Sequence, residues 1–125
     1  MKRISVLAAL GGLMVIALVP PTALAHKSAS KTQRSAILAA IVKQKQLSKA
    51  QASCQVVTIS TVNSSYASAS WPKRLSKSCE KVAANGVIIE HLQANAWHFV
   101  TVGSSFQCPI KGVPTPVARD LGVCS

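Results

Sequence analysis

Four cysteines, Cys54, Cys79, Cys108 and Cys124, constrain the fold of this chain more than any other feature. Their even number predicts two disulfides in a chain that reaches an oxidising compartment. Three pairings are open, and we favour Cys54–Cys79 and Cys108–Cys124 because each pair closes a compact neighbouring segment. No two cysteines have the C-x-x-C spacing of a structural zinc site, so we expect disulfides and not zinc.

The first 25 residues have the pattern of a secretory signal peptide. Basic Lys2–Arg3 precede an uncharged apolar run of 16 residues, Ile4–Val19, and Ala23–Ala25 gives a small-x-small cleavage sequence. The run is shorter than the roughly 18 to 20 residues needed to cross a bilayer, although an uncleaved anchor is the alternative. We therefore predict a signal peptide over 1–25 and one secreted, disulfide-linked domain over 26–125, with no transmembrane segment in the mature chain.

The charge of the chain is strongly one-sided, with a formal net charge of +11. Without Lys2 and Arg3, twelve basic residues remain against Glu80, Glu90 and Asp120, which gives +9 for the mature domain. Such a charge attracts polyanions. The expected partner is an anionic envelope component or an acidic protein, because export disfavours nucleic acid. The alternative is that these charges only solvate the surface.

A single helix is predicted over residues 32–47, after a polar, flexible lead-in at 26–32. Its apolar positions follow the i, i+1, i+4, i+5 spacing of one helical stripe. They are Ile37, Leu38, Ile41 and Val42. A stripe of about two turns is unstable alone and needs a sheet to cover. A membrane-surface helix is the alternative, but the stripe carries no aromatic residue.

Strands are predicted over 54–62, over 66–71, and in a hairpin formed by 86–92 and 97–103. In the C-terminal tail, Thr115 is expected to cap a short helix that starts at Pro116, and Gly122 suits its C-terminal end. The fold class is therefore α+β. It comprises one N-terminal helix packed on an antiparallel sheet of about three to four strands, a short C-terminal helix and two disulfides.

The hairpin raises the sharpest functional question, because a loop of 93–96 or a tight turn at 94–95 both place His91 opposite His98. A loop of three or five residues would shift the pairing by one and separate the two histidines. One face would then carry Val87, Ile89 and His91 against Val102, Val100 and His98, and the other would carry Ile88, Glu90 and Leu92 against Thr101, Phe99 and Trp97. Both faces are largely apolar. Whatever the helices leave uncovered is a candidate pocket, partner surface or homodimer interface.

A metal site is one use of the two histidines, because opposing Cβ atoms lie about 4.5 to 5.5 Å apart. Cleavage after Ala25 would add His26, whose amino group and ring form a copper(II) chelate. In this one residue the chain resembles copper-binding and oxidative polysaccharide enzymes with a histidine brace, although the sequence after His26 approaches a helix and not a sandwich strand. Solvated histidines or a pH-responsive binding site are the alternatives.

Signals for catalysis are few. The chain contains no G-x-S-x-G sequence, no phosphate-binding loop and no dinucleotide fingerprint. The three carboxylates are far apart in the sequence, which disfavours a paired-acid hydrolase. A Ser-His-Asp triad assembled from distant residues stays open. We therefore expect a non-enzymatic protein without a required cofactor.

Several motifs carry a resemblance that spans residues 37–124. They are "GVIIEH", "NAWHFVTVGSSFQCP" and "DLGVC". In these the chain resembles uncharacterised small secreted bacterial proteins with a signal peptide and four cysteines. The resemblance implies a secreted domain and supplies no catalytic residues. A helix followed by an antiparallel meander also resembles cystatin and NTF2-type architectures, which host inhibitors, pockets and enzymes.

These observations predict a basic binding or cell-envelope-associated domain, secreted or extracytoplasmic. Its apolar contact surface is predicted at Leu92, Trp97, Phe99 and Trp71, and its cationic loop at Lys73, Arg74, Lys77 and Lys81. The first alternative is metal binding, with copper, through His26, His91 and His98. The second alternative is an inhibitor of an enzyme, which requires a rigid protruding loop.

Overall fold

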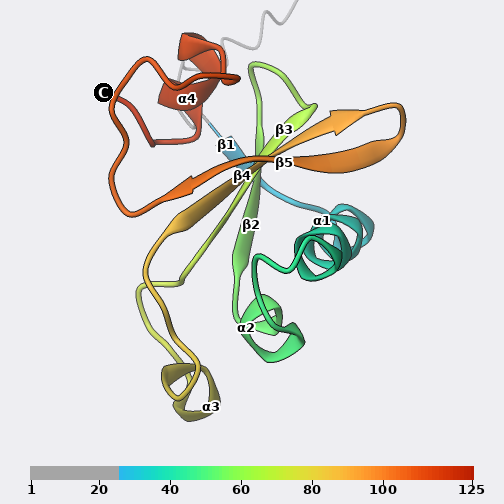
Figure 1. Ribbon diagram of the computed structural model, residues 1–125, viewed down its shortest axis with the longest axis vertical. Coiled ribbons are helices and arrows are strands. Elements are labelled where there is room, and N and C mark those ends of the chain that lie inside the picture. The colour runs from blue at the N-terminus through green and yellow to red at the C-terminus, as the bar shows by residue number, and fades with distance from the viewer. Residues whose placement is uncertain (1–25) are drawn as a thin grey trace, which may run out of the picture.

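The computed structural model describes residues 26–125, so the predicted signal peptide lies outside the described residues. The described chain forms an antiparallel sheet of five strands in the order β1-β2-β3-β4-β5, with four helices (Figure 1). The strands are β1 His26–Ser28, β2 Val56–Ser60, β3 Tyr66–Ser70, β4 Val87–Gln93 and β5 Ala96–Gly103. The helices are α1 Lys31–Lys43, α2 Lys49–Ser53, α3 Lys77–Glu80 and α4 Thr115–Asp120. None of the helices in 26–125 has the length and apolar character required for a membrane span.

Two reciprocal capping boxes set the starts of α1 and α2. The Ser30 hydroxyl accepts from the Gln33 amide at 3.1 Å, and the Gln33 side chain accepts from the Ser30 amide at 2.9 Å. Ser48 and Gln51 repeat this arrangement at α2. Each box satisfies amides that the first helical turn leaves unpaired. Sequence analysis missed the second box and extended one helix to residue 47, whereas α1 ends before Lys45, which has a φ of 60°.

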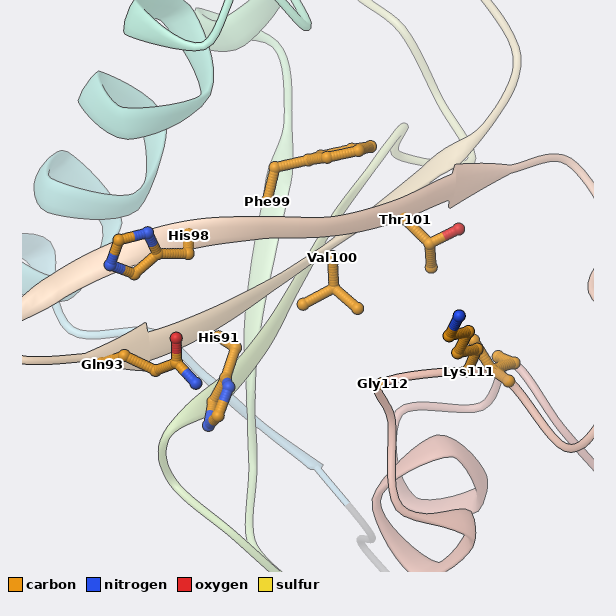
Figure 2. Close-up of a pocket in the computed structure, with 9 residues that line it drawn as sticks. His91, Gln93, His98, Phe99, Val100, Thr101, Lys111 and Gly112 are labelled. Atoms are coloured by element: carbon orange, nitrogen blue, oxygen red, sulfur yellow. The ribbon is translucent and has the colours of Figure 1, made fainter.

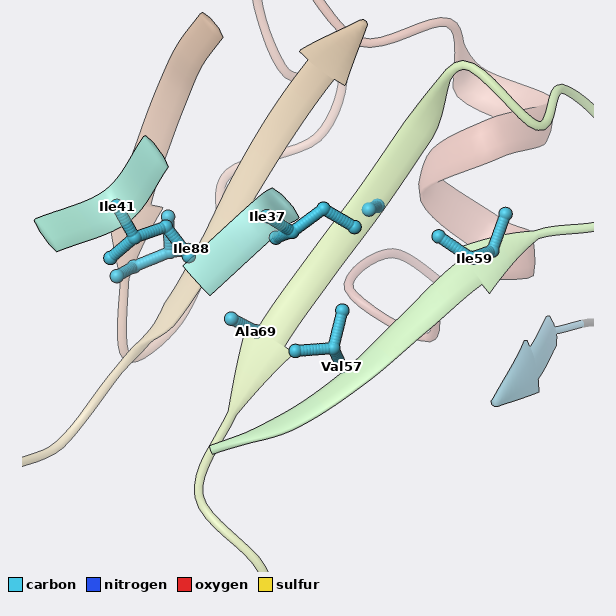
Figure 3. Close-up of a cluster of buried hydrophobic side chains, with 7 residues drawn as sticks. Ile37, Ile41, Val57, Ile59, Ala69 and Ile88 are labelled. Atoms are coloured by element: carbon cyan, nitrogen blue, oxygen red, sulfur yellow. The ribbon is translucent and has the colours of Figure 1, made fainter. Parts of the chain in front are cut away.

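One face of the sheet, here called the α1 face, packs against α1 (Figure 3). Ile37 and Ile41 of the helix are fully buried against side chains from three strands. The strand residues are Val57, Ile59, Ala67, Ala69 and Ile88. The predicted apolar stripe is thus a core stripe, and burying each isoleucine contributes about 1.5 to 3 kcal/mol.

The C-terminal segment covers part of the opposite face, here called the C-terminal face. Val117, Ala118 and Leu121 of the α4 region pack with Ile110 and Val113 on Tyr66 and Ile89. Gly122, with a φ of 75°, ends this helix in the left-handed conformation expected from the sequence. The helix begins one residue earlier than predicted, since Pro114 and not Thr115 occupies the N-cap and no side chain caps it.

The β4–β5 hairpin confirms the tight-turn register. Ala94 and Asn95 have φ values of 49° and 61°, as a two-residue type I′ turn requires, and His91 pairs with His98. A β-bulge between Ile89 and Glu90 then shifts the ladder, so that Ile89 faces Thr101. The predicted pairing of Ile89 with Val100 was therefore wrong, because the bulge inserts one extra residue into β5.

Two further expectations about the elements need correction. The predicted flexible lead-in contains β1, which pairs with β2 through His26↔Ser60 and Ser28↔Thr58. The basic segment after Pro72 contains the short helix α3. Both elements are too short to show a hydrophobic period in the sequence, and strand pairing and a disulfide hold them.

Both disulfides have the predicted connectivity within the described chain. Cys54–Cys79 joins the end of α2 to α3, and Cys108–Cys124 joins the segment after β5 to the C-terminus. No free cysteine is present in residues 26–125. Figure 1 places α3 near one end of the long axis of the molecule and α4 near the other, so each disulfide stabilises a different end.

Candidate functional site

The main candidate site is a groove of about 540 Å³ on the C-terminal face, here called the histidine groove. It lies between the β4–β5 hairpin and the segment 110–112 (Figure 2). Its lining residues are His91, Gln93, His98, Phe99, Val100, Thr101, Ile110, Lys111 and Gly112. The hairpin register brings the two histidines to the same face, as the sequence predicted. The groove is open, so a ligand would remain partly in solvent.

An aromatic stack positions His91. Its ring lies 4.1 Å from the ring of Tyr66, centroid to centroid, with an interplanar angle of 7°. The Tyr66 hydroxyl donates to the Gly112 carbonyl at 3.2 Å. Tyr66 thus holds both the imidazole on β4 and the opposite wall of the groove. His91 is half-buried, while His98 is exposed.

The bulge and one glycine shape the middle of the groove. Val100, the extra residue of the bulge, packs against the C-terminal core beside Ile110. Gly112 has a φ of 85°, and a Cβ at this position would lie 3.2 Å from Val100. A residue with a side chain would therefore be both strained and crowded at position 112. Val100 and Ile110 give the groove an apolar floor between its polar ends.

The groove presents hydrogen-bond donors and positive charge. Figure 2 shows His91, His98 and Gln93 towards one end and Lys111 towards the other, with Val100 between them. Lys111 is exposed. No carboxylate lines this groove in the part of the chain that the structure describes. The arrangement is suited to an elongated ligand that is negatively charged at both ends.

Glu90 is enclosed on the α1 face of the sheet, away from the groove. Desolvation by burial raises its pKa to about 7, and the Gln44 side chain opposes this in part. The Gln44 amide nitrogen, however, donates to the Trp97 carbonyl at 3.1 Å. Neither Glu90 oxygen has a hydrogen-bond partner among the described residues. Glu90 is therefore a buried carboxyl group that is mostly protonated below its pKa of about 7.

Asp120 has a structural role at the end of α4. Burial tends to raise its pKa, but hydrogen bonds from Ser60, Thr61 and Val62 outweigh this and hold the pKa below its usual value. The Ser60 hydroxyl and the Thr61 amide donate to Asp120 Oδ2 at 2.6 and 2.7 Å. The carboxylate thus joins α4 to the end of β2.

The structure separates the predicted contact surface into two places. Trp97 is half-buried and packs against the α1 core, and Leu92 beside it is also half-buried. Phe99 is 38% exposed, and its side chain points away from the groove in Figure 2. Trp71 lines a different pocket with Gly86 and Val87, at the start of β4. The length of β4 separates Trp71 from the other three residues.

The predicted cationic loop, residues 73–81, forms an exposed projection. Its four cations, Lys73, Arg74, Lys77 and Lys81, are all exposed. The Cys54–Cys79 disulfide holds the loop to α2, and the Ser76 hydroxyl accepts from the Cys79 amide at 3.3 Å to cap α3. The loop is therefore anchored by a covalent bond near its C-terminal end.

The three predicted metal ligands are not all brought together, because His26 lies on a strand far from the paired His91 and His98. His26 pairs with Ser60 on the edge strand β1, which lies three strands from β4. With strands about 4.8 Å apart, its backbone is about 14 Å from the strand of His91. Among the side chains that the structure describes, in residues 27–125, no group of three or more His, Cys, Asp or Glu is arranged to hold a metal ion.

The comparisons with known proteins found no matching family model, no matching curated protein and no matching solved structure. The resemblance to small secreted proteins therefore stays a prediction.

Sequence reasoning named no site residue in the groove wall formed by Ile110, Lys111 and Gly112, and it did not single out Gln93. Lys111 lies 13 positions after His98 and carries no pattern of its own. The Cys108–Cys124 prediction was the available signal, because a disulfide that folds the tail back on the sheet also brings Lys111 to the hairpin. The burial of Glu90, in the middle of β4, was also missed, since glutamate side chains are almost never fully buried.

Proposed function

We propose that this protein is a non-enzymatic, basic binding domain that acts outside the cytoplasm and docks on an anionic component of the cell envelope. One observation carries the proposal. Eleven of the twelve Lys and Arg side chains in residues 26–125 are exposed, whereas Glu80 is the exposed carboxylate among the three in this range. The accessible charge is therefore more one-sided than the composition suggests, and it attracts polyanions at long range.

The cationic loop is suited to make the first contact. It places four exposed cations on one short, disulfide-anchored segment at one end of the molecule (Figure 1). Anchoring the loop lowers the conformational entropy lost on binding, since the segment is already ordered. Two disulfides also support a location in an oxidising compartment.

The positions of the carboxylates support a binding role over an acid–base hydrolase. Glu90 lies on the α1 face, and hydrogen bonds hold Asp120 at the C-terminal end of α4. Neither carboxylate lines the histidine groove. A general acid and base need to approach the same substrate within hydrogen-bond distance. The two histidines are instead accompanied by Lys111 and Gln93, whose N–H groups can donate hydrogen bonds to a ligand.

Binding to vesicles that contain an anionic lipid, and to polyglutamate, tests this function across a salt series. We expect the affinity to fall steeply as salt rises, because exposed charges are screened beyond about 10 Å at 0.1 M salt. A variant with Lys73, Arg74, Lys77 and Lys81 changed to Gln should lose most of the affinity.

The matched control changes Lys31, Lys43, Lys45 and Lys49 to Gln, which removes the same charge from exposed positions in and near α1 and α2. It should retain more affinity than the loop variant. Equal losses in both variants would contradict a docking role for the loop, and no binding at low salt would contradict the function itself.

An enzyme inhibitor is a second candidate, and the anchored projection of residues 73–81 favours it. Inhibitors present a rigid loop that changes little on binding. Copper binding through His26, His91 and His98 gains no such support, because β1 and β4 are separated by two strands.

A further inference from the structure

The histidine groove has hydrogen-bond donors at both ends and an apolar floor between them, an arrangement that the cationic loop lacks. The imidazoles of His91 and His98, with the Gln93 amide, lie towards one end, and the Lys111 ammonium lies towards the other (Figure 2). Val100 and Ile110 supply an apolar floor between them. A single small anion would contact one end alone. Two anionic groups joined by a short carbon linker would use both ends and the floor.

The donor chemistry favours phosphate over carboxylate. Planar carboxylates are typically bound by the paired N–H groups of arginine, and no arginine lines the groove in the described chain. Lysine and histidine act as separately directed donors, which suit the tetrahedral oxygens of a phosphate. A divalent cation is disfavoured, because Lys111 and the surrounding basic surface repel it.

We propose that the histidine groove binds a segment of a linear polymer whose units are joined by phosphodiesters. One phosphodiester contacts His91, His98 and Gln93, the next contacts Lys111, and the linking carbons lie on Val100. This inference rests on the proposed function and narrows the anionic component to one chemical class.

Calorimetric titration of the oxidised domain with glycerol phosphate and with a short poly(glycerol phosphate) oligomer tests the inference. The oligomer should bind at least about tenfold more tightly than the monomer. His98→Gln and Lys111→Gln should each weaken oligomer binding about tenfold, which corresponds to one charge-assisted hydrogen bond.

Lys31→Gln is the matched control, because it removes the same charge as Lys111→Gln at an exposed site in α1, outside both the groove and the cationic loop. It should leave oligomer binding within about twofold of the unchanged protein. His98 is preferred to His91 because it is exposed and lies outside the Tyr66 stack. Circular dichroism of each variant confirms folding before its affinity is compared.

The inference is overturned if Lys31→Gln weakens oligomer binding as much as Lys111→Gln, since net charge alone would then explain the affinity. It is also overturned if polyglutamate of equal charge competes fully for the groove, or if cardiolipin vesicles bind through the groove residues while the oligomer does not. Failure of the proposed function gives a different result, because polyglutamate and anionic vesicles would then fail to bind at low salt.

Discussion

At the scale of single residues, Glu90 is the most unusual group in the described chain. It is fully buried on the α1 face, where neither carboxylate oxygen accepts a hydrogen bond from the described residues. Burying an ionised carboxylate without partners is costly, and the cost appears as a pKa raised to about 7. The folded domain therefore retains a proton that the unfolded chain releases at lower pH.

Glu90 is expected to make the domain less stable as the pH rises. Because its pKa in the folded state, about 7, exceeds the ordinary value of 4.5, its contribution is fully present below pH 4.5 and is lost as the pH rises through 7. The loss amounts to at most about 3 kcal/mol. Glu90→Gln should remove this slope and raise stability at pH 8, as measured by urea unfolding across pH.

Glu80→Gln, which removes an exposed carboxylate, is the control and should retain the slope. A pH profile that is identical in Glu90→Gln and the unchanged protein would show that Glu90 does not titrate in this range.

At the scale of elements, the β4–β5 hairpin does the most to create the groove. Its turn places His91 opposite His98, and its bulge adds Val100 to the groove while shifting Thr101 opposite Ile89. The histidine pairing was predicted from a loop of two or four residues, because both of these loop lengths give the same register. The bulge was not predictable, since β-branched residues on both sides of it fit either register equally well.

The turn itself is not optimal, which makes it a site for stabilisation. Ala94 has a φ of 49°, and a left-handed alanine costs roughly 1 to 2 kcal/mol. Asparagine tolerates this conformation and is favoured in type I′ turns. Ala94→Asn should therefore raise the free energy of unfolding by about 0.5 to 1 kcal/mol, measured by chemical denaturation.

Ala96→Asn is the comparison for the turn prediction, because Ala96 is an exposed residue of β5 where asparagine has a poor strand propensity. It should lower stability slightly. If both variants changed stability in the same direction, the strain at Ala94 would not be the cause.

At the scale of the whole molecule, the two disulfides stabilise opposite ends of the protein. Cys54–Cys79 holds the cationic loop to α2, and Cys108–Cys124 encloses the segment that carries Lys111 and Gly112. They close sequence separations of 25 and 16 residues. Each contributes on the order of 3 kcal/mol by restricting the unfolded chain.

Removing the disulfides one at a time should separate the two proposed binding activities. The variant with Cys108 and Cys124 changed to Ala should lose about 3 kcal/mol of stability and most of its affinity for poly(glycerol phosphate). The variant with Cys54 and Cys79 changed to Ala should lose similar stability but keep the groove, while its binding to polyglutamate weakens. Thermal unfolding and calorimetric titration measure both effects, and an equal loss of both ligands in either variant would argue against separate sites.

The sequence alone determined the features that depend on local chemistry. These are the apolar stripe of Ile37 and Ile41 and the left-handed Gly122 at the end of α4. The cysteine pairing and the pairing of His91 with His98 were favoured among a few alternatives, and the structure confirms both. Each follows from spacing or turn geometry over a short stretch of chain, where the number of alternatives is small.

Only the tertiary structure decided what surrounds those residues. Lys111 lines the histidine groove, and Glu90 is buried. His26 lies on the edge strand β1, and Trp71 is separated from Trp97. These outcomes depend on how distant elements pack, because the environment of a side chain comes from residues that are close in space and far apart in sequence.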